Sequence, residues 1–390
     1  MRWKILALLF LARVRLGLQF QTLASTGDYL REEFSLGFVD IGSLIGLFML
    51  PGLVLAMPAG LIGRYVSDRV LVSGGLGLLA AGGFLAAIGS GYDWLAAARI
   101  IAGIGFVITS IYFTKMTTDW FAGKELATAL SVLVMSWPIG IAIGQVGHEW
   151  LAAAFGWPSA FIAAASFCLL AALAILGGYR PADSGMVPVA AQKTHFLTRH
   201  EVILTSLAGL AWGFFNAAYV VYLSFAPKIL TAAGIGALQA AAVISIASWV
   251  MIFSGVLSGY IADRFGKPYA MIYAGLSIAI LSLLLLQYVE FASFFALAFG
   301  LFGMAPAGLI IAFSGAAIAA ERRASGMGFY FSIYFLVVTP APAIAGWLLD
   351  RSGDAYDAII FAALLFALTA AAAVCFQICR RRLATAADLP

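Results

Sequence analysis

The chain has 390 residues, of which 63% are hydrophobic and only 10% are charged, and its mean hydropathy is +1.02. This usage is too apolar for a soluble domain and is typical of a membrane protein. The net charge of +4 does not indicate a nucleic-acid partner, because the basic residues are dispersed along the chain instead of forming one soluble patch.

Twelve apolar runs follow one another along the chain, separated by short polar gaps. A bilayer core about 30 Å thick needs roughly 20 apolar residues per spanning helix, and each run approaches or exceeds that length. The pattern predicts an all-α membrane protein whose helices satisfy their own backbone groups. The predicted spans are 4–25, 40–62, 70–90, 94–116, 126–148, 157–178, 202–225, 237–259, 268–288, 292–318, 325–348 and 357–379.

The first run has two arginines in its centre and no clear cleavage site, so we expect a retained helix and not a signal peptide. The three cysteines, Cys168, Cys375 and Cys379, fall within or at the end of predicted spans. They give no disulfide framework and no metal-ligand spacing. We expect neither a metal nor a cofactor.

Basic residues are distributed unequally between the two sides of the predicted membrane. Sixteen lie in one set of gaps and four in the other, and positive charge is retained on the cytoplasmic side. The sequence therefore predicts that both termini are cytoplasmic. The sixteen are Arg2, Lys4, Arg64, Arg69, Lys115, Lys124, Arg180, Lys193, Arg199, Arg264, Lys267, Arg322, Arg323, Arg380, Arg381 and Arg382, and the four are Arg31, Arg99, Lys228 and Arg351.

The longest polar gap divides the chain into two halves that repeat one another. We predict a six-helix bundle at 1–179, a cytoplasmic linker at 180–200, and a second bundle with a short cytoplasmic tail at 201–390. The segment Gly259 to Lys267 follows span 8, and its degenerate copy, Gly60 to Arg69, follows span 2. Six spans per half give both halves the same orientation, so an axis along the membrane normal relates them.

These features resemble the major facilitator superfamily, whose members carry a G-x-L-A-D-R-x-G-R-like sequence between spans 2 and 3 and often again between spans 8 and 9. The second copy matches it at Gly259, Asp263, Arg264, Gly266 and Lys267. The resemblance implies twelve transmembrane helices in two six-helix bundles, related by a pseudo-twofold along the membrane normal. It extends over essentially the whole chain and is silent about substrate.

The first copy departs from the family sequence. Arg64 stands at the acidic position and Ser67 at the second glycine, although Asp68 offers a displaced carboxylate. In the fourth span, Arg99 and Gly103 are similar to the R-x-x-x-G of the family. More loosely, 115–121 and 136–140 resemble the bacterial branch that holds cyanate-permease-like proteins and, more distantly, nitrate porters. The fifth-span signature of proton-drug antiporters is only partly present, because Trp137 replaces its glycine.

The repeated segments are predicted to act as gates. The acid of the turn can cap or pair with a neighbouring helix end and hold the cytoplasmic face closed, while the glycines permit the tight turn. For Arg99, near the outer end of its span, snorkelling to the membrane surface is the alternative. The candidate gating residues are Gly60, Asp68, Arg69, Arg99, Gly259, Asp263, Arg264, Gly266 and Lys267.

Arg13 and Arg15 lie near the bilayer centre, where one arginine costs roughly 2.5–3.5 kcal/mol on insertion scales. At about 100° per residue, Arg13 and Gln21 share one face of the helix, while Arg15 and Gln19 share nearly the opposite one. We expect one guanidinium to coordinate an anionic substrate. The alternative is an anchor to carbonyl groups of a neighbouring helix.

Acidic residues are absent from the middle of the predicted spans, which favours an anion or a neutral solute over a cation. A coupling proton or other ion is left open, and Glu201, at a helix end, is one carboxylate that could serve. His148 beside Glu149 could respond to pH, although a lone interfacial histidine is usually only solvated.

Polar and aromatic side chains form a stripe on the seventh helix, where Trp212, Asn216 and Tyr219 recur at helical spacing. Such a stripe suits a ligand wall, but interhelical hydrogen bonding uses the same residue types. Packing is also the alternative for the shorter pairs on other helices. The candidate substrate-binding residues are Arg13, Arg15, Gln19, Gln21, Tyr112, Trp137, Trp212, Asn216, Tyr219, Tyr330 and Tyr334.

The sequence thus predicts a secondary active transporter that moves a small solute, an organic or inorganic anion, by alternating access between the two bundles. The alternatives are an efflux antiporter for hydrophobic compounds and a transport-dead membrane receptor. No Walker-type phosphate loop and no catalytic constellation is present, so we do not expect an enzyme. We expect a monomer in the plasma membrane, the inner membrane of a bacterium, with the lipid bilayer and the solute as its partners.

Overall fold

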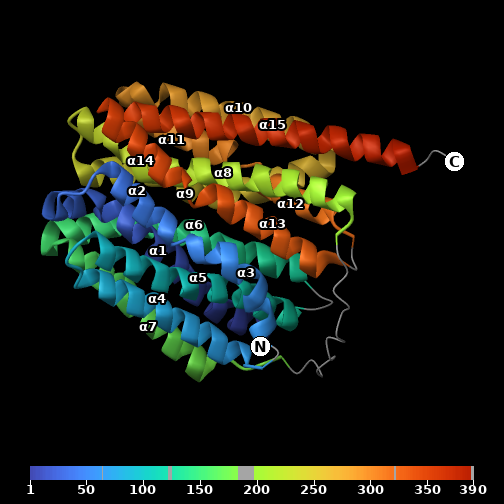
Figure 1. Ribbon diagram of the computed structural model, residues 1–390, viewed down its shortest axis with the longest axis horizontal. Coiled ribbons are helices and arrows are strands. Elements are labelled where there is room, and N and C mark those ends of the chain that lie inside the picture. The colour runs from blue at the N-terminus through green and yellow to red at the C-terminus, as the bar shows by residue number, and fades with distance from the viewer. Residues whose placement is uncertain (64, 122–124, 183–196, 320–321, 388–390) are drawn as a thin grey trace.

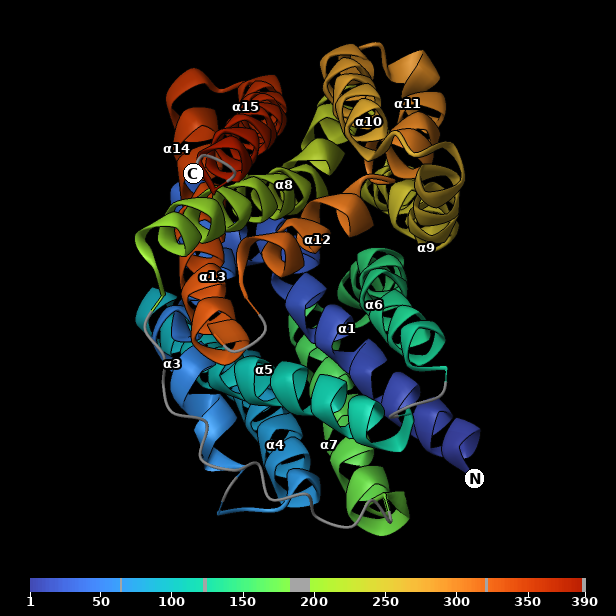
Figure 2. The same cartoon turned by 90° about the vertical axis from the view of Figure 1, so that its right-hand side faces the viewer.

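The computed structural model describes residues 1–390 except 64, 122–124, 183–196, 320–321 and 388–390. The described part contains helices and no strand, and twelve of its helical segments are long and apolar enough to cross a membrane. This confirms the fold class. An even number of spans returns the chain to the end at which it started. We call this the terminal end, onto which Figure 2 looks, and the other the opposite end.

The first half of the chain forms one helical bundle, drawn in blue to green in Figure 1. Within it, α1 packs against α6 and α7, and α4 packs against α5 and α7. Its helices are α1 (Arg2–Phe34), α2 (Phe38–Leu47), α3 (Leu50–Ile62), α4 (Asp68–Ala87), α5 (Tyr92–Phe121), α6 (Leu126–Phe155) and α7 (Trp157–Gly178).

The second half forms the other bundle, drawn in yellow-green to red in Figure 1. Its central helix α8 packs against α13 and α15, and α15 also packs against α10. Its elements are α8 (Arg199–Ala232), α9 (Ala237–Phe265), α10 (Pro268–Leu284), η1 (Leu285–Gln287), η2 (Val289–Phe291), α11 (Ala292–Ala298), η3 (Phe299–Gly303), α12 (Ala307–Ala317), α13 (Arg323–Val338), α14 (Ala341–Ser352) and α15 (Ala355–Ala387).

The packing pattern repeats between the bundles. Span 1 packs on span 6 (α1 on α7) as span 7 packs on span 12 (α8 on α15), and α4 packs on α7 as α10 packs on α15. The contacts between the bundles obey the same rule, since span 2 meets span 11 and span 5 meets span 8. The linker expected at 180–200 lies mostly outside the described residues.

Three spans that were predicted to be continuous helices are interrupted in the structure. Span 40–62 breaks between α2 and α3 just before Pro51, span 325–348 breaks between α13 and α14 at Pro340, and span 292–318 passes through the π-helical η3 and a turn that ends at Pro306. Proline lacks a backbone donor and its ring crowds the preceding turn, which explains each break. Pro138, by contrast, lies inside the continuous helix α6.

The bundles approach most closely where α2 crosses α14, at the opposite end. A Cβ placed on Gly42 would overlap the Pro342 carbonyl oxygen, and one on Gly346 would overlap that of Phe38. Glycines on both helices therefore bring the two backbones into direct contact, as in other tightly packed membrane helices. Toward the terminal end, α3 continues this contact with α13, where Gly52 lies against the Phe335 ring.

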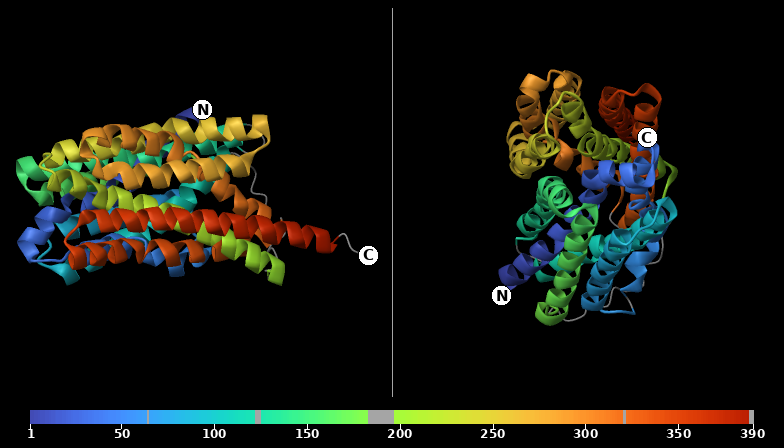
Figure 3. Two further views of the ribbon diagram at one scale, coloured as in Figure 1. Left: turned by 90° about the horizontal axis from the view of Figure 1, so that it is seen from above. Right: turned by 90° about the vertical axis from the view of Figure 1, so that its left-hand side faces the viewer.

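Large apolar side chains cover the outward faces of both bundles. On α7, for example, Phe167, Leu170 and Leu173 are exposed. Such surface is expected where lipid, and not water, surrounds a protein. The helices lie side by side along the long dimension of the molecule, and α15 extends beyond the others at the terminal end (Figure 3).

Candidate functional site

Arg13 lies in the middle of α1 and points toward α6. Its Nη1 donates hydrogen bonds of 2.9 Å to the Leu133 carbonyl oxygen and to Oγ of Ser136. Its Nε has no partner, and no carboxylate in the described part of the chain forms an ion pair with it. The side chain is partly exposed. A guanidinium with free donors and no counter-charge is suited to bind an anion.

Arg15 faces a different neighbour. Its guanidinium lies 5.3 Å from the ring centroid of Phe167 on α7, and Phe167 is itself 46% exposed on the outer surface. Arg13 and Arg15 thus contact different helices, as their angular separation on α1 requires. The structure places Arg13 toward the interior of the bundle and Arg15 near its lipid-facing side.

Four aromatic rings form a closed set beside Arg13. Centroid distances are 5.6 Å from Phe20 to Phe48, 5.1 Å from Phe48 to Phe106, 5.5 Å from Phe106 to Trp137, and 5.4 Å from Trp137 back to Phe20. These are ordinary distances for interacting rings. We call Phe20, Phe48, Phe106 and Trp137 the aromatic quartet. Trp137 and Phe106 remain partly exposed, so the quartet presents ring surface beyond its own packing.

Arg99 is buried inside the first bundle and contacts two members of the quartet, Phe20 and Phe48. The side chain is 1% exposed, and it donates to the carbonyl oxygens of Leu44 at 3.2 Å, Gln19 at 3.4 Å and Phe20 at 3.5 Å. Its Cζ lies 4.4 Å from the ring centroid of Phe48. The alternative that Arg99 snorkels to the membrane surface is therefore wrong, because the guanidinium ties α1 and α2 to α5.

The two glutamines of α1 point in different directions. Nε2 of Gln19 donates to the Leu79 carbonyl oxygen of α4 at 3.3 Å, and Nε2 of Gln21 donates to Oγ of Ser25 at 3.3 Å. Both side chains are buried, and the Oε1 atom of each has no partner. Neither glutamine forms a hydrogen bond with a member of the aromatic quartet; their amides bond to α4 and to Ser25 of α1.

In the second bundle, Trp212 and Tyr334 bring α8 and α13 together. Their rings stack at 6.5 Å, and Trp212 also stacks on Phe215 at 5.9 Å. The other stripe residues of α8 are committed elsewhere. Asn216 donates to the carbonyl oxygen of Trp212 on its own helix at 2.8 Å, and the Tyr219 hydroxyl bonds Oγ of Ser248 on α9 at 2.7 Å.

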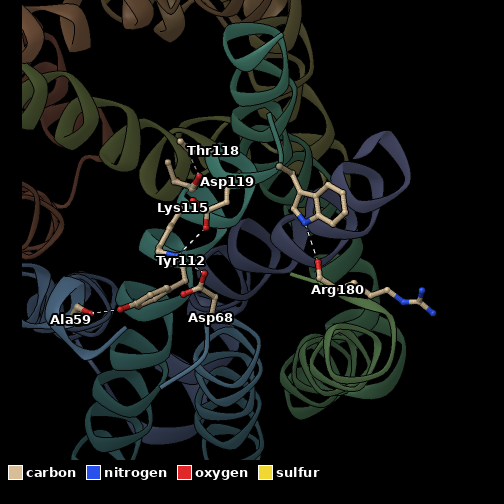
Figure 4. A network of polar contacts seen from close by, with 9 residues as sticks. Ala59, Asp68, Tyr112, Lys115, Thr118, Asp119 and Arg180 are labelled. Carbon is tan, nitrogen blue, oxygen red and sulfur yellow. Dashed lines mark hydrogen bonds and ion pairs between the residues drawn. The ribbon is translucent and has the colours of Figure 1, made fainter. Parts of the chain in front are cut away.

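Tyr330 is fully buried beside Phe331, at a centroid distance of 5.3 Å, and its hydroxyl has no hydrogen-bond partner. Tyr112 is buried in the first bundle, where its hydroxyl donates to the Ala59 carbonyl oxygen at 2.8 Å (Figure 4). The structure therefore places Tyr112 in the packing of α3 on α5, apart from the residues around Arg13.

Helix register places the aromatic quartet of the first bundle and the Trp212–Tyr334 pair of the second at the same depth along the membrane normal. Gly17, one turn beyond Arg13, lies against the backbone of Trp137, and Phe48 is one turn from Gly52, which contacts the Phe335 ring. On the other side, Gly213 packs on Val337, so Trp212 and Tyr334 lie at the level of Phe335. Arg13 and the quartet thus lie at about the same depth as Trp212 and Tyr334 of the second bundle.

Of the gate residues predicted in the first half, Asp68 takes part in an ion-pair network at the terminal end (Figure 4). Lys115 Nζ lies 2.5 Å from Oδ2 of Asp68 and 2.9 Å from Oδ2 of Asp119. Asp68 therefore supplies a carboxylate at the start of α4, one position beyond Ser67. Nε of Arg69 is buried without a partner, and Gly60 lies in the last turns of α3.

The copy that matches the family sequence more fully lies at the end of α9. Gly266 has φ 62°, a left-handed conformation that favours glycine, and its N–H donates to the Ala262 carbonyl oxygen. Nη1 of Arg264 donates to the hydroxyl of Tyr260 at 3.0 Å. Gly259 lies within α9, Lys267 directly precedes α10, and the side chain of Asp263 lies outside the described residues.

Glu201 is bonded at the terminal end of α8 and is not free inside the bundle. Its carboxylate accepts hydrogen bonds from Arg322 Nε at 2.9 Å and from the Ala319 N–H at 3.1 Å, and it also forms a capping box with Thr198. These contacts tie α8 to the segment between α12 and α13.

Polar contacts between the bundles occur at the opposite end, and the sequence analysis did not identify them. The carboxylate of Asp350, near the end of α14, accepts from the N–H groups of Phe38 at 2.8 Å and Val39 at 2.7 Å, at the start of α2. Lys228 of α8 forms an ion pair with Asp28 of α1. Asp350 carries no sequence signal of this role, because its partners are backbone groups 311 and 312 residues away.

Twelve spans in two bundles that meet at paired helices define a multi-pass membrane protein of the two-bundle type. The chain belongs to the major facilitator superfamily, because the sequence model described as Major Facilitator Superfamily matches residues 9–342. The superfamily resemblance found in the motifs is thereby confirmed.

Relatives and solved structures agree with this assignment. The uncharacterised MFS-type transporter YbcL of Bacillus subtilis is 27% identical over 74% of this chain and 73% of its own length. The cis,cis-muconate transport protein of Acinetobacter baylyi is 22% identical over 93% of this chain and 92% of its own. The structure of a bacterial homologue of the human lysosomal transporter Spinster, inward-facing and unoccupied, matches with a TM-score of 0.77 at 16% identity over 97% of both chains. The chain is accordingly a secondary transporter of a small solute.

Proposed function

We propose that this protein moves a small organic anion across the membrane and that Arg13 coordinates the anionic group. The observation that carries the proposal is an arginine at mid-depth with free donors and no carboxylate partner within the described residues. Keeping such a charge in an apolar setting is costly unless a counter-charge arrives. A carboxylate matches the planar donor pattern of a guanidinium better than a spherical ion does.

The proposal extends to alternating access between the bundles. Asp350 and Lys228 join the bundles at the opposite end, whereas the ion pairs of Lys115 with Asp68 and of Arg322 with Glu201 at the terminal end join residues of the same bundle. This distribution suits a state closed at the opposite end. Because the sequence predicts an excess of basic residues on the terminal side, we propose that this side faces the cytoplasm and that the protein lies in the inner membrane of a bacterium.

The comparisons support the anion class indirectly. The cis,cis-muconate transport protein is named for a dicarboxylate, and the looser resemblance to the cyanate and nitrate branch also points to a small anion. Two bundles in one chain enclose the path by themselves, so we propose that the monomer is the working unit. A coupling ion completes the proposal.

The alternative, efflux of hydrophobic compounds, draws on the aromatic quartet together with Trp212 and Tyr334. Ring surface of this extent would also accept a lipophilic solute. The two proposals differ in the charge of the solute that can bind near Arg13, since a guanidinium attracts an anion and repels a cation.

Transport into proteoliposomes distinguishes the candidates. The purified full chain would be reconstituted and offered cis,cis-muconate, benzoate, cyanate and nitrate in parallel with the cationic dye ethidium. We expect uptake of at least one organic anion and no movement of the dye. Movement of ethidium without any anion would establish the efflux alternative, and the absence of both would favour a receptor without transport activity.

A further inference from the structure

Three buried polar side chains lie in the half of α6 toward the opposite end or next to it: Gln21 and His148 against Gly144, and Gln145 directly after that glycine. Gln21 is 0% exposed, and Gln145 and His148 are each 2% exposed. Each keeps at least one atom without a hydrogen-bond partner, namely Oε1 of both glutamines and both ring nitrogens of His148. A buried polar atom without a partner costs about 1–3 kcal/mol, so four in one place require an explanation.

The glycine brings the side chains of Gln21 and His148 together. A Cβ placed on Gly144 would lie 3.0 Å from Cβ of Gln21, 3.1 Å from Cε1 of His148 and 3.2 Å from its Nδ1. The imidazole therefore lies over Gly144 in the groove between α6 and α1. Gln145 precedes His148 by three positions, which makes the two neighbours on the helix surface, with Cβ atoms about 5–6 Å apart.

Hydrogen bonds fix the orientation of both amides. Nε2 of Gln145 donates to the Leu223 carbonyl oxygen of α8 at 3.4 Å. Nε2 of Gln21 donates to Oγ of Ser25, which in turn donates to the Gly144 carbonyl oxygen at 3.4 Å. A carbonyl only accepts, so each amide nitrogen has to face its present partner. Both amide oxygens are thereby left as free acceptors.

Two carboxylates of this region, those of Glu149 and Asp28, are bonded to other groups. Glu149 accepts from the Tyr29 hydroxyl at 2.9 Å, and Asp28 pairs with Lys228. No charged group in the described part of the chain forms a hydrogen bond or ion pair with His148. On this region of α6 and on the elements packed against it, the titratable groups are Arg13, Arg15, Asp28, Tyr29, Arg31, Glu32 and Glu33 of α1, Tyr92, Asp93 and Arg99 of α5, Glu149 of α6, Cys168 of α7, and Tyr219, Tyr222 and Lys228 of α8. Toward the terminal end the same elements carry Arg2 and Lys4 of α1, Tyr112, Lys115 and Asp119 of α5, Arg199, His200 and Glu201 of α8, and Tyr260, Asp263 and Arg264 of α9.

We propose that His148, with Gln21 and Gln145, is the binding site of a coupling proton. The inference rests on the proposed transport function and specifies its coupling ion. A neutral imidazole has one N–H donor and one acceptor nitrogen, whereas an imidazolium has two donors. Only the protonated form matches two amide oxygens that are both restricted to accepting. In this structure neither nitrogen is bonded, so the match is completed by rotation of side chains within the cluster.

The proton affinity of the site also depends on whether the two bundles are in contact or separated at the opposite end. The bond from Gln145 to Leu223 crosses from α6 to α8, and it is this bond that turns the amide oxygen of Gln145 away from α8. When the opposite end opens, α8 withdraws, Gln145 is free to rotate, and water reaches His148. The proton binds the lone pair of the free imidazole nitrogen from that water and later returns to water. Because proton affinity differs between the two states, binding and conformation are coupled.

Histidine NMR tests the site without any substrate. The chain has three histidines, His148, His195 and His200, so nitrogen-15 histidine labelling of the reconstituted protein gives a readable spectrum. We expect one titrating signal that disappears in His148→Gln, with a midpoint between about pH 5 and 8. Gln21→Leu and Gln145→Leu should each lower that midpoint by about one pH unit, a tenfold loss of proton affinity. A His148 that stays neutral over this range, or that ignores both glutamine substitutions, would overturn the proposal.

Flux measurements separate this inference from the transport function. With radiolabelled cis,cis-muconate as probe, we expect accumulation driven by a pH gradient to fall at least about tenfold in His148→Gln, while exchange without a gradient continues. His200→Gln, at the exposed start of α8, is the matched control and should accumulate the probe like the unsubstituted chain. Full accumulation by His148→Gln would refute the proton site. Failure of the unsubstituted chain to exchange the probe would count against muconate as substrate, and the NMR titration would still decide the site.

Discussion

At the scale of single residues, two arginines separated by one position have different surroundings. Arg13 donates to α6 and keeps free donors, whereas Arg15 lies over Phe167 near the lipid. We predict that Arg13→Gln lowers the initial rate of anion uptake on the order of 100-fold, because a charged hydrogen bond to the substrate is lost. Arg15→Gln, the matched control, should retain most of the rate. Equal and mild losses in both variants would contradict the assignment.

The same scale shows which residues sequence reasoning could find. Arg13 was identifiable because charge is rare at mid-membrane, and Trp137 because it replaces a motif glycine. Phe20, Phe48 and Phe106 gave no signal among 30 phenylalanines, because their shared role depends on four helices meeting. Asn216 and Tyr219 were proposed for a ligand wall, and in the structure both have hydrogen-bond partners inside the protein.

At the scale of elements, Arg99 joins three helices through carbonyl groups of α1 and α2. Lysine keeps the charge but has one nitrogen, which cannot reach three carbonyl oxygens and the Phe48 ring together. We predict that Arg99→Lys lowers the free energy of unfolding by about 1–3 kcal/mol. Thermal unfolding in detergent, followed by tryptophan fluorescence, measures this. Arg351→Lys, at an exposed site beside Trp347, should leave the transition temperature nearly unchanged. Equal shifts in Arg99→Lys and Arg351→Lys would show that the carbonyl contacts of Arg99 do not stabilise the protein.

Asp350 is the second element-scale feature, because it accepts from the first N–H groups of α2 across the interface. A carboxylate is favoured at a helix N-terminus by hydrogen bonding and by the helix dipole. We predict that Asp350→Asn shifts the equilibrium about tenfold toward separation at the opposite end. Spin labels at Leu36→Cys and Ser352→Cys would report a larger population of long distances.

The matched control for Asp350 is Asp354→Asn. Oδ1 of Asp354 accepts from the Tyr356 N–H at 2.9 Å, within the loop that starts α15, so its loss should not affect the distance between bundles. An unchanged distance distribution in Asp350→Asn would show that the contact does not hold the ends together.

At the scale of the whole molecule, the prediction concerns orientation. The excess of basic residues predicted for the terminal side leads us to expect that this side faces the cytoplasm. In intact cells, in a background without the three native cysteines, a membrane-impermeant maleimide should label Ser352→Cys. It should label Lys4→Cys only after permeabilisation. Labelling of Lys4→Cys in intact cells would reverse the orientation and, with it, the side to which the structure is closed.

The sequence alone determined the helical class, the twelve spans and the repeat, because burial in lipid requires long apolar helices and each helix carries that requirement in its own composition. Tertiary structure decided which side chains meet. Residues far apart in the chain meet in the aromatic quartet, in the contacts of Arg99 with carbonyl groups, in the contacts of Asp350 with N–H groups, and around His148. Several of these contacts involve backbone groups, and the residues around His148 have unpartnered polar atoms. Local composition cannot predict such long-range contacts, because they depend on the register and crossing angles of whole helices.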